Sequence, residues 1–159
     1  MTILIVYGTN SGGTMSAGQG LADRLTPAGH QVILKAAPDA QAADLDKPDL
    51  IILGSCTWSG DVNGVSEGGQ LQEHMAQLVE RLQGYNGQGR RFAVYALGDS
   101  SYDTFCQAAD HLEKFVASIH GTLIVPSLRI DRYYFDHDTN DAALTVWVTS
   151  INTALTKTS

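Results

Sequence analysis

Unbroken apolar runs recur along the chain and alternate with stretches in which hydrophobic residues return every three or four positions. The run Leu4–Tyr7 contains no charged or amide side chain, and the runs at 49–54 and 92–98 are almost as apolar. Runs of this kind are typical of strands that are buried on both faces of a parallel sheet. The strands that we predict cover residues 4–7, 31–35, 49–54, 92–98 and 122–128.

Between these strands the hydrophobic pattern has the period of an amphipathic helix. Leu71, Met75, Leu78 and Leu82 follow one another at i, i+4, i+7 and i+11 spacing. The helices that we predict cover residues 14–28, 70–82, 105–119 and 141–155. Strands that alternate with helices indicate an α/β fold, here a doubly wound five-stranded parallel sheet with helices on both faces. In such sheets ligands bind outside the carboxyl ends of the strands.

Composition narrows the class of protein without naming a function. A chain of 159 residues with 43% hydrophobic and 17% charged residues predicts one globular domain, residues 1–159. The net charge of −7 argues against a nucleic-acid partner and permits attraction to a basic protein. No apolar run approaches the ~20 residues of a membrane span, and the amino terminus lacks a basic signal segment. Two cysteines are too few for a disulfide framework, so we expect a cytoplasmic protein. We also expect it to be a monomer.

Three loops at the carboxyl ends of predicted strands carry the candidate chemistry. The first, Gly8–Thr14, contains three glycines and three Ser or Thr hydroxyls but no cation. It lacks the lysine of the phosphate loop G-x-x-x-x-G-K-[ST], and it has Asn10 where the dinucleotide-binding pattern G-x-G-x-x-G has its second glycine. Free N–H groups and the dipole of the following helix can nevertheless hold a phosphate by geometry. The alternative is a plain turn in which Ser11 or Thr14 caps the helix.

The second and third loops each offer a large aromatic side chain. Trp58 lies in the segment 55–61, which is followed by a glycine-rich stretch, and Tyr102 lies in the segment 98–103. Each ring alone is explained by local packing over the sheet edge, whereas two rings that flank one site predict a flat, apolar ligand ring between them. These loops contain Asp61, Asp99 and Asp103 but no Lys or Arg, so we expect an acidic site.

Together these segments resemble the flavodoxin family, in particular its short-chain form. The matching residues are Ile5-Val6-Tyr7-Gly8-Thr9-x-Ser11-Gly12-x-Thr14, Gly54-x-x-Thr57-Trp58, Gly98-Asp99-Ser100-Ser101-Tyr102-x-x-Phe105-Cys106 and Leu128-Arg129-Ile130-Asp131. The resemblance implies a flavodoxin-like sheet of strand order 2-1-3-4-5 and a one-electron carrier that binds FMN. It implies that the first loop holds the FMN phosphate, that Trp58 and Tyr102 flank the flavin ring, and that the backbone around Asp99 faces its pyrimidine edge.

The candidate cofactor-binding residues follow from these loops and from the resemblance. They are Thr9, Asn10, Ser11, Gly12, Gly13, Thr14, Ser55, Cys56, Thr57, Trp58, Ser59, Gly60, Gly98, Asp99, Tyr102, Phe105 and Cys106. The chain departs from the family pattern at two positions: Gly13 stands where many members have Asn, and Ser59 stands where a glycine is common. Whether Ser59 or Gly60 contacts atom N5 of the flavin stays open. The stretch 61–69 also looks longer than in short-chain members.

Several functional alternatives remain beside the electron carrier. Tyr102-Asp103-Thr104-Phe105-Cys106 and Phe135-Asp136-His137-Asp138 are also similar to small MioC-type flavodoxin-like proteins, which suggests an accessory FMN-binding role. A small FMN-dependent reductase is a further alternative, although covered ring faces leave little room for hydride transfer. We therefore predict no catalytic residues, and a basic-patched redox partner such as a flavodoxin reductase.

Two further groups have ordinary explanations. Asp136, His137 and Asp138 are adjacent residues that cannot all face one ion, so we predict no metal and expect Asp138 or Thr139 to cap the last helix. We expect Cys56 to be a packing residue rather than an oxidisable thiol, and Cys106 to be buried at a helix start.

Overall fold

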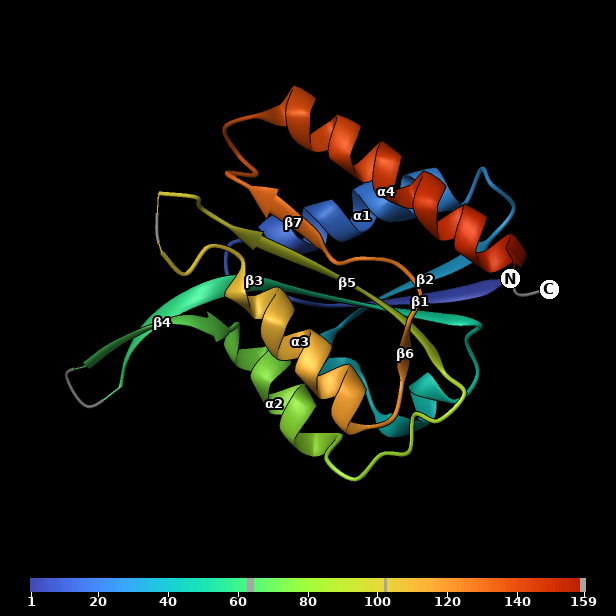
Figure 1. Cartoon of the computed structure of the whole chain (residues 1–159), viewed down its shortest axis with the longest axis horizontal. Coiled ribbons are helices and arrows are strands. Elements are labelled where there is room, and N and C mark those ends of the chain that lie inside the picture. Colours follow the sequence, from blue (N-terminus) through green and yellow to red (C-terminus); the bar gives the residue numbers. More distant parts are fainter. Residues whose placement is uncertain (63–64, 102, 158–159) are drawn as a thin grey trace.

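The computed structural model describes the backbone of residues 1–62, 65–101 and 103–157, and the side chains of these residues apart from 58–68. A parallel sheet forms the centre of the molecule (Figure 1). It contains β1 (Thr2–Gly8), β2 (Gln31–Ala36), β3 (Leu50–Val62), β5 (Arg91–Gly98) and β6 (Thr122–Leu123). Their spatial order is β2-β1-β3-β5-β6. This order confirms the predicted arrangement 2-1-3-4-5, because β5 and β6 take the places of the fourth and fifth predicted strands.

Helices cover both faces of the sheet (Figure 1). On one face lie α1 (Gly13–Leu25) and α4 (His137–Lys157), and on the other lie α2 (Glu73–Arg81) and α3 (Gln107–Ser118). The short 3-10 helices η1 (Ala37–Asp39) and η2 (Ala42–Leu45) follow β2. Alternation along β1 sends Ile3 and Ile5 into the core with α1 and α4, and Leu4 and Val6 into the core with α2 and α3. Burial on both faces explains why the strand is continuously apolar.

The segment after residue 54 differs from the prediction. Instead of ending in a loop, β3 continues to Val62 and pairs antiparallel with β4 (Val65–Leu71). The register shifts between Trp58 and Gly60, which places a bulge at Ser59. The glycines and serines of this segment resemble those of a loop. Pairing with β4 gives their backbone N–H and C=O groups hydrogen-bond partners, and no local sequence pattern reveals such pairing.

The predicted fifth strand is divided into two pieces. Besides β6, the strand β7 (Leu128–Asp131) pairs in parallel with β5, opposite residues 95–98. Pro126 lies between the two pieces and has no N–H to donate to a ladder. Its carbonyl instead accepts a hydrogen bond of 2.8 Å from Nε1 of Trp147 on α4. As a result β7 is carried to the carboxyl end of β5, where the ligand site was predicted.

The helices begin and end a few residues from their predicted positions. α1 ends at Leu25 rather than at residue 28, and the chain reverses through Gly29, whose φ is 91°. α2 begins at Glu73 rather than at residue 70, because the side chain of Gln72 caps it by accepting from Met75 N. α3 begins at Gln107 and not at residue 105.

α4 starts four residues before the predicted residue 141, at His137. Asp136 Oδ1 accepts from Thr139 N at 3.2 Å, so the expectation that Asp138 or Thr139 caps this helix was wrong. An acceptor preceding the first turn satisfies its free N–H groups, and Asp136 holds that position.

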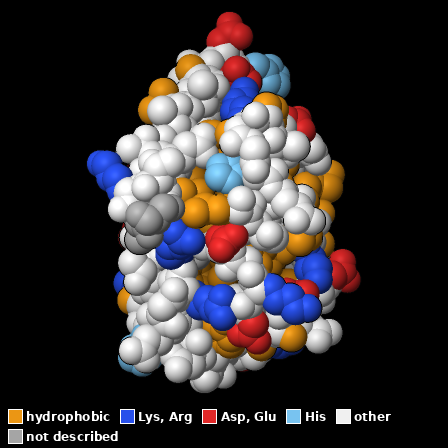
Figure 2. Space-filling model, turned by 90° about the vertical axis from the view of Figure 1, so that its right-hand side faces the viewer, with side chains coloured by type: hydrophobic (Ala, Val, Ile, Leu, Met, Phe, Trp, Pro, Cys, Tyr) orange, Lys and Arg blue, Asp and Glu red, His pale blue; other side chains and the backbone are white. Residues whose placement is uncertain are grey.

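The amino ends of the strands form the face of the molecule at which β1 begins and α4 ends (Figure 1), and Figure 2 views this face. Figure 2 shows Lys and Arg side chains on this face interspersed with Asp and Glu. The Lys and Arg side chains visible there therefore do not form a continuous basic patch. No helix in the described ranges has the length and apolar character needed to span a membrane.

Candidate functional site

A cavity of about 370 Å³ opens at the opposite edge, where the strands have their carboxyl ends. This size falls in the range of roughly 300–1,000 Å³ that is usual for small-molecule sites. Its lining residues are Thr9, Ser11, Gly13, Thr14, Cys56, Thr57, Leu97, Gly98, Asp99, Thr104, Arg132, Tyr133, Tyr134 and Phe135. They come from β3, from the end of β5, from the start of α1 and from the segments that follow β1, β5 and β7, so four strands position one site.

The cavity brings together residues from all three predicted loops. Eight of the predicted binding residues line it, namely Thr9, Ser11, Gly13, Thr14, Cys56, Thr57, Gly98 and Asp99. The other predicted residues for which the structure describes side chains do not line it; they are Asn10, Gly12, Ser55, Phe105 and Cys106. The side chains of Trp58, Ser59 and Gly60 and the whole of Tyr102 lie outside the described residues, so their predicted contacts stay predictions.

The first loop turns tightly between β1 and α1. Gly12 has a φ of 89°, a conformation that glycine adopts at little cost, and its N–H donates to Thr9 Oγ1 at 2.9 Å. A Cβ at Gly8 would collide with Gln72 Oε1 and lie 2.7 Å from Met75 Cβ, so the loop also needs a glycine at its start. Gln72 fixes the loop from the side, since its Nε2 donates to Asn10 Oδ1 at 2.9 Å.

Thr14 is the residue of this loop that points to a ligand. It is 1% exposed, and its Oγ1 is buried without a hydrogen-bond partner of ordinary geometry among the described residues. The helix cap is Gly12, and no side chain makes the capping hydrogen bond, so the alternative in which Ser11 or Thr14 caps α1 was wrong. Buried hydroxyls are usually paired, and this one sits in the first turn of α1, where N–H groups have no carbonyl one turn earlier. The arrangement suits an anion with several acceptor oxygens.

The thiol of Cys56 faces the same cavity from β3. Burial raises the pKa of Cys56, while the neighbouring Thr14 hydroxyl and the backbone of Asn10 lower it by less. The contact between this thiol and the Thr14 hydroxyl does not have the geometry of a hydrogen bond. The thiol is therefore protonated near neutral pH and is not a reactive thiolate. This agrees with the expected packing role.

The third loop begins where the chain has no room for a side chain. A Cβ at Gly98 would lie 2.7 Å from the backbone N of Cys106. Cys106 is fully buried, adopts a φ of 50° immediately before α3, and places its Sγ 3.5 Å from Ala96 O. Burial raises the pKa of Cys106 to about 12. The expectation of a buried, unreactive cysteine at a helix start is confirmed.

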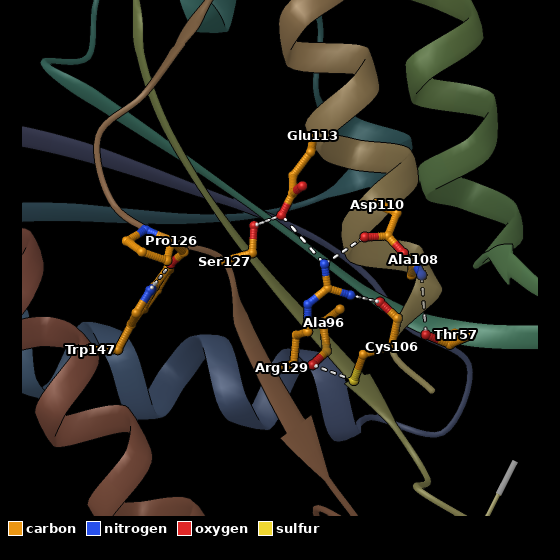
Figure 3. A network of polar contacts seen from close by, with 10 residues as sticks. All are labelled: Thr57, Ala96, Cys106, Ala108, Asp110, Glu113, Pro126, Ser127, Arg129 and Trp147. Atoms are coloured by element: carbon orange, nitrogen blue, oxygen red, sulfur yellow. Dashed lines mark hydrogen bonds and ion pairs between the residues drawn. The ribbon is translucent and has the colours of Figure 1, made fainter. Parts of the chain in front are cut away.

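Arg129 holds the end of this loop against β7 (Figure 3). Its Nη1 donates to Cys106 O at 2.9 Å, and its Nη2 bonds Asp110 at 2.6 Å and lies 3.5 Å from Glu113. On the other side of α3, Thr57 Oγ1 accepts from Ala108 N at 3.3 Å. The first turn of α3 is thus fastened both to β3 and to β7.

Two aspartates order the rest of the third loop. Asp131 accepts from Ser100 N at 2.9 Å and from Ser100 Oγ at 2.7 Å. Asp99 accepts from Ser101 N at 2.8 Å and pairs with Arg132 Nε at 3.3 Å. These bonds lower the pKa of both carboxyl groups, for Asp131 mainly through Ser100 and for Asp99 mainly through Ser101, with a smaller effect of Arg132.

Sequence reasoning missed a fourth lining segment, residues 132–135, which we call the β7–α4 strap. All four of its residues line the cavity, and Phe135 is 85% and Tyr134 50% exposed. Arg132 also shows that the expectation of a site without Lys or Arg was wrong. The prediction ended the fifth strand at residue 128, whereas β7 ends at Asp131. Applying the carboxyl-edge rule to the true end of this strand would have found Arg-Tyr-Tyr-Phe directly after it.

No cluster of three His, Cys, Asp or Glu side chains within the described ranges has the geometry to hold a metal ion. Asp136 instead caps α4, and His137 begins that helix. The three adjacent residues Asp136–Asp138 are thus accounted for by the start of a helix.

Comparison with known sequences gives a consistent picture. The sequence model of the family described as flavodoxin matches residues 5–143. A flavodoxin of Nitratidesulfovibrio vulgaris is 30% identical over 154 residues, which cover 96% of this chain and 98% of that protein. A MioC homologue of Pasteurella multocida is 30% identical over 131 residues, covering 81% of this chain and 82% of that protein.

Solved structures share the fold over almost the whole chain. The oxidised flavodoxin 2 of Bacillus cereus superposes with a TM-score of 0.84 at 27% identity, over 96% of this chain and 98% of that one. A Fusobacterium nucleatum flavodoxin bound to flavin mononucleotide superposes with a TM-score of 0.79 at 15% identity, over 96% of this chain and 97% of that one.

Proposed function

The chain belongs to the flavodoxin family, and we propose that the cavity at the carboxyl edge of its sheet is the FMN site of a low-potential electron carrier. Membership of this family establishes an FMN-binding electron carrier. The location of the cofactor and the residues that hold it are proposals. FMN when bound accepts and donates electrons, and the protein contributes position, hydrogen bonds and charge.

One observation carries the proposed site, namely the unpartnered buried hydroxyl of Thr14 at the start of α1. A phosphate monoester would give this hydroxyl an acceptor and would also accept from the N–H groups of the first helical turn. Thr9 and Ser11 line the same end of the cavity and offer further hydroxyl groups. Binding there needs no lysine or arginine, which explains the uncharged composition of the first loop.

The flavin ring would lie beyond the phosphate, against the ends of β3 and β5. Thr57, Leu97, Gly98 and Asp99 line this part of the cavity. We propose that Trp58 and Tyr102 flank the ring and that the backbone around Asp99 faces its polar edge. Asp99 and Arg132 form an ion pair there, so the charge on this side is partly balanced instead of purely acidic.

The setting of the reaction follows from charge and family. A net charge of −7 favours a redox partner with a basic patch, such as a flavodoxin reductase, and disfavours nucleic acid. We propose that the chain is a single-domain, monomeric, cytoplasmic carrier and that it is not itself an enzyme. The similarity to a MioC homologue keeps an accessory FMN-binding role as one alternative. A small FMN-dependent reductase is the other alternative.

Titration of the apoprotein tests the proposed site. We expect FMN to bind more than about 100-fold more tightly than riboflavin, because several charge-assisted hydrogen bonds to the phosphate contribute about 1.5–3 kcal/mol each. Fluorescence quenching of each flavin gives both dissociation constants. Equal affinity for the two flavins would contradict the phosphate assignment. Oxidation of NADPH by the FMN-loaded protein alone would favour the reductase alternative over the carrier.

A further inference from the structure

The β7–α4 strap touches the phosphate-binding loop across a long sequence separation. Tyr134 Oη donates to Ser11 O at 2.9 Å, and Tyr133 Oη hydrogen-bonds Ser16 Oγ at 2.9 Å. Ser11 belongs to the first loop and Ser16 to the first turns of α1. In Figure 1 the chain after β7 passes the start of α1 before it enters α4. Two successive tyrosines therefore fasten the strap to both sides of the helix start.

The strap has a defined shape of its own. Arg132 adopts a φ of 47°, and its N–H donates to Gly98 O at 2.9 Å. Phe135 N donates to Arg132 O at 2.8 Å, which closes a turn, and Asn140 Nδ2 donates to Tyr133 O at 3.2 Å. The two tyrosine rings meet edge to face, with centroids 5.6 Å apart. The strap thus arrives at the first loop as an ordered element that is anchored to β5 and α4.

Gly13 and Tyr134 fit one another. A Cβ at Gly13 would lie 3.1 Å from Tyr134 Oη and 3.2 Å from both Tyr134 Cε2 and Leu97 Cδ2, which is closer than side chains normally pack. Because Leu97 crowds the same position, a larger residue at position 13 would have to displace the tyrosine from Ser11, the leucine, or both. The ring occupies the space into which a side chain at position 13 would extend, and this explains why the chain has glycine where many family members have asparagine.

The hydrogen bond of Tyr134 also acts on a particular peptide. The carbonyl of the Ser11–Gly12 peptide accepts from Tyr134, and its N–H donates to Thr9 Oγ1. This peptide is held at both ends, immediately before the first turn of α1. The N–H groups of Gly13 and Thr14 follow, in the positions that have no helical acceptor.

We infer that Tyr134 is a positioning residue for the phosphate end of the cofactor and that Gly13 is its matched partner. The tyrosine latches the Ser11–Gly12 peptide and so fixes the direction of the donors that follow it. Preorganised donors cost less ordering on binding, so the latch raises affinity for a phosphate monoester without touching it. This inference rests on the proposed function of the cavity and extends it to residues that the family pattern does not supply.

The test compares FMN with riboflavin in variants of Tyr134 and Gly13 and in one control variant. Tyr134→Phe keeps the ring and removes one hydrogen bond, so we expect it to lower FMN affinity by about two- to tenfold and to leave riboflavin affinity unchanged. Gly13→Ala should lower FMN affinity more, and its effect should be smaller in a Tyr134→Ala background, where Leu97 Cδ2 at 3.2 Å still crowds the added Cβ but the tyrosine does not. Tyr85→Phe removes a 2.9 Å bond to Asp46 far from the cavity and serves as the matched control.

Hydrogen exchange in the apoprotein gives a second readout, since Tyr134→Phe should speed exchange of the amides at positions 11–14. An equal loss of affinity for FMN and for riboflavin would overturn the latch while leaving the proposed FMN site intact. An unchanged ratio of the two affinities together with unchanged hydrogen exchange would do the same. A wild-type protein that binds neither flavin would instead overturn the proposed function. The two failures are therefore distinguishable.

Discussion

The loop after β1 and the loop after β5 line the same cavity but are stabilised in different ways. The first loop, Gly8–Thr14, has no charged residue and depends on Gly8 and Gly12, where a side chain would clash or strain the backbone. The third loop, Gly98–Cys106, is held by carboxylates: Asp131 binds Ser100, and Asp99 binds Ser101 and Arg132.

This difference shows where hydrogen-bonding groups remain available for a ligand. In the third loop the described polar groups of Ser100 and Asp99 are used to shape the loop itself. In the first loop the hydroxyl of Thr14 is buried and unused. We therefore expect the first loop to contribute specific affinity for the phosphate, and the third loop to contribute shape and electrostatic tuning at the flavin ring.

The largest expected effect comes from removing the unused hydroxyl. Thr14→Val keeps the shape of the side chain and should weaken FMN binding on the order of 10- to 100-fold, because a hydrogen bond to a charged group contributes about 1.5–3 kcal/mol. Riboflavin binding should stay the same. Fluorescence titration of the apoprotein measures both, and Thr149→Val on the exposed side of α4 is the control. A loss that is equal for both flavins would mean that Thr14 faces the ring.

A smaller effect is expected on the reduction potential when the ion pair of the third loop is broken. Arg132→Gln removes a positive charge beside the flavin and should lower the potential by on the order of tens of millivolts, whereas Asp99→Asn should raise it. The double variant should lie between the two. Redox titration followed by absorbance gives these values, with Arg91→Gln at the opposite edge as the control. A higher potential for Arg132→Gln would contradict this account.

The smallest effect concerns acid. Hydrogen bonds from Ser100 lower the pKa of Asp131 below 3.8, so the ionised carboxylate stabilises the third loop above that pH. This stabilisation is lost as the pH falls through the lowered pKa of Asp131. Asp131→Asn should weaken FMN binding at pH 7 by less than about tenfold. The wild type and the variant should converge in affinity as the pH falls below 3.8. A constant ratio across that range would show that the charge of Asp131 does not support the loop.

The strands that bear the first and third loops were predictable because both faces of each strand are buried. Continuous apolar runs identified the buried parts of β1, β3 and β5, and the carboxyl-edge rule then located eight of the lining residues. β4 was missed because its residues resemble a loop until they pair with β3. β7 was merged with β6 because a break at Pro126 changes little in the local hydrophobic pattern.

Apolar periodicity in the sequence predicted the strands and helices, and the resemblance to the flavodoxin family predicted the strand order and the first loop as the place for a phosphate. Only the tertiary structure decided that Arg132 pairs with Asp99, that Thr14 is left without a partner, and that Tyr134 fills the space above Gly13. The last of these contacts joins residues more than a hundred positions apart, through the hydrogen bond from Tyr134 to Ser11. Such contacts depend on where β7 ends against β5, and a local pattern holds no information on that register.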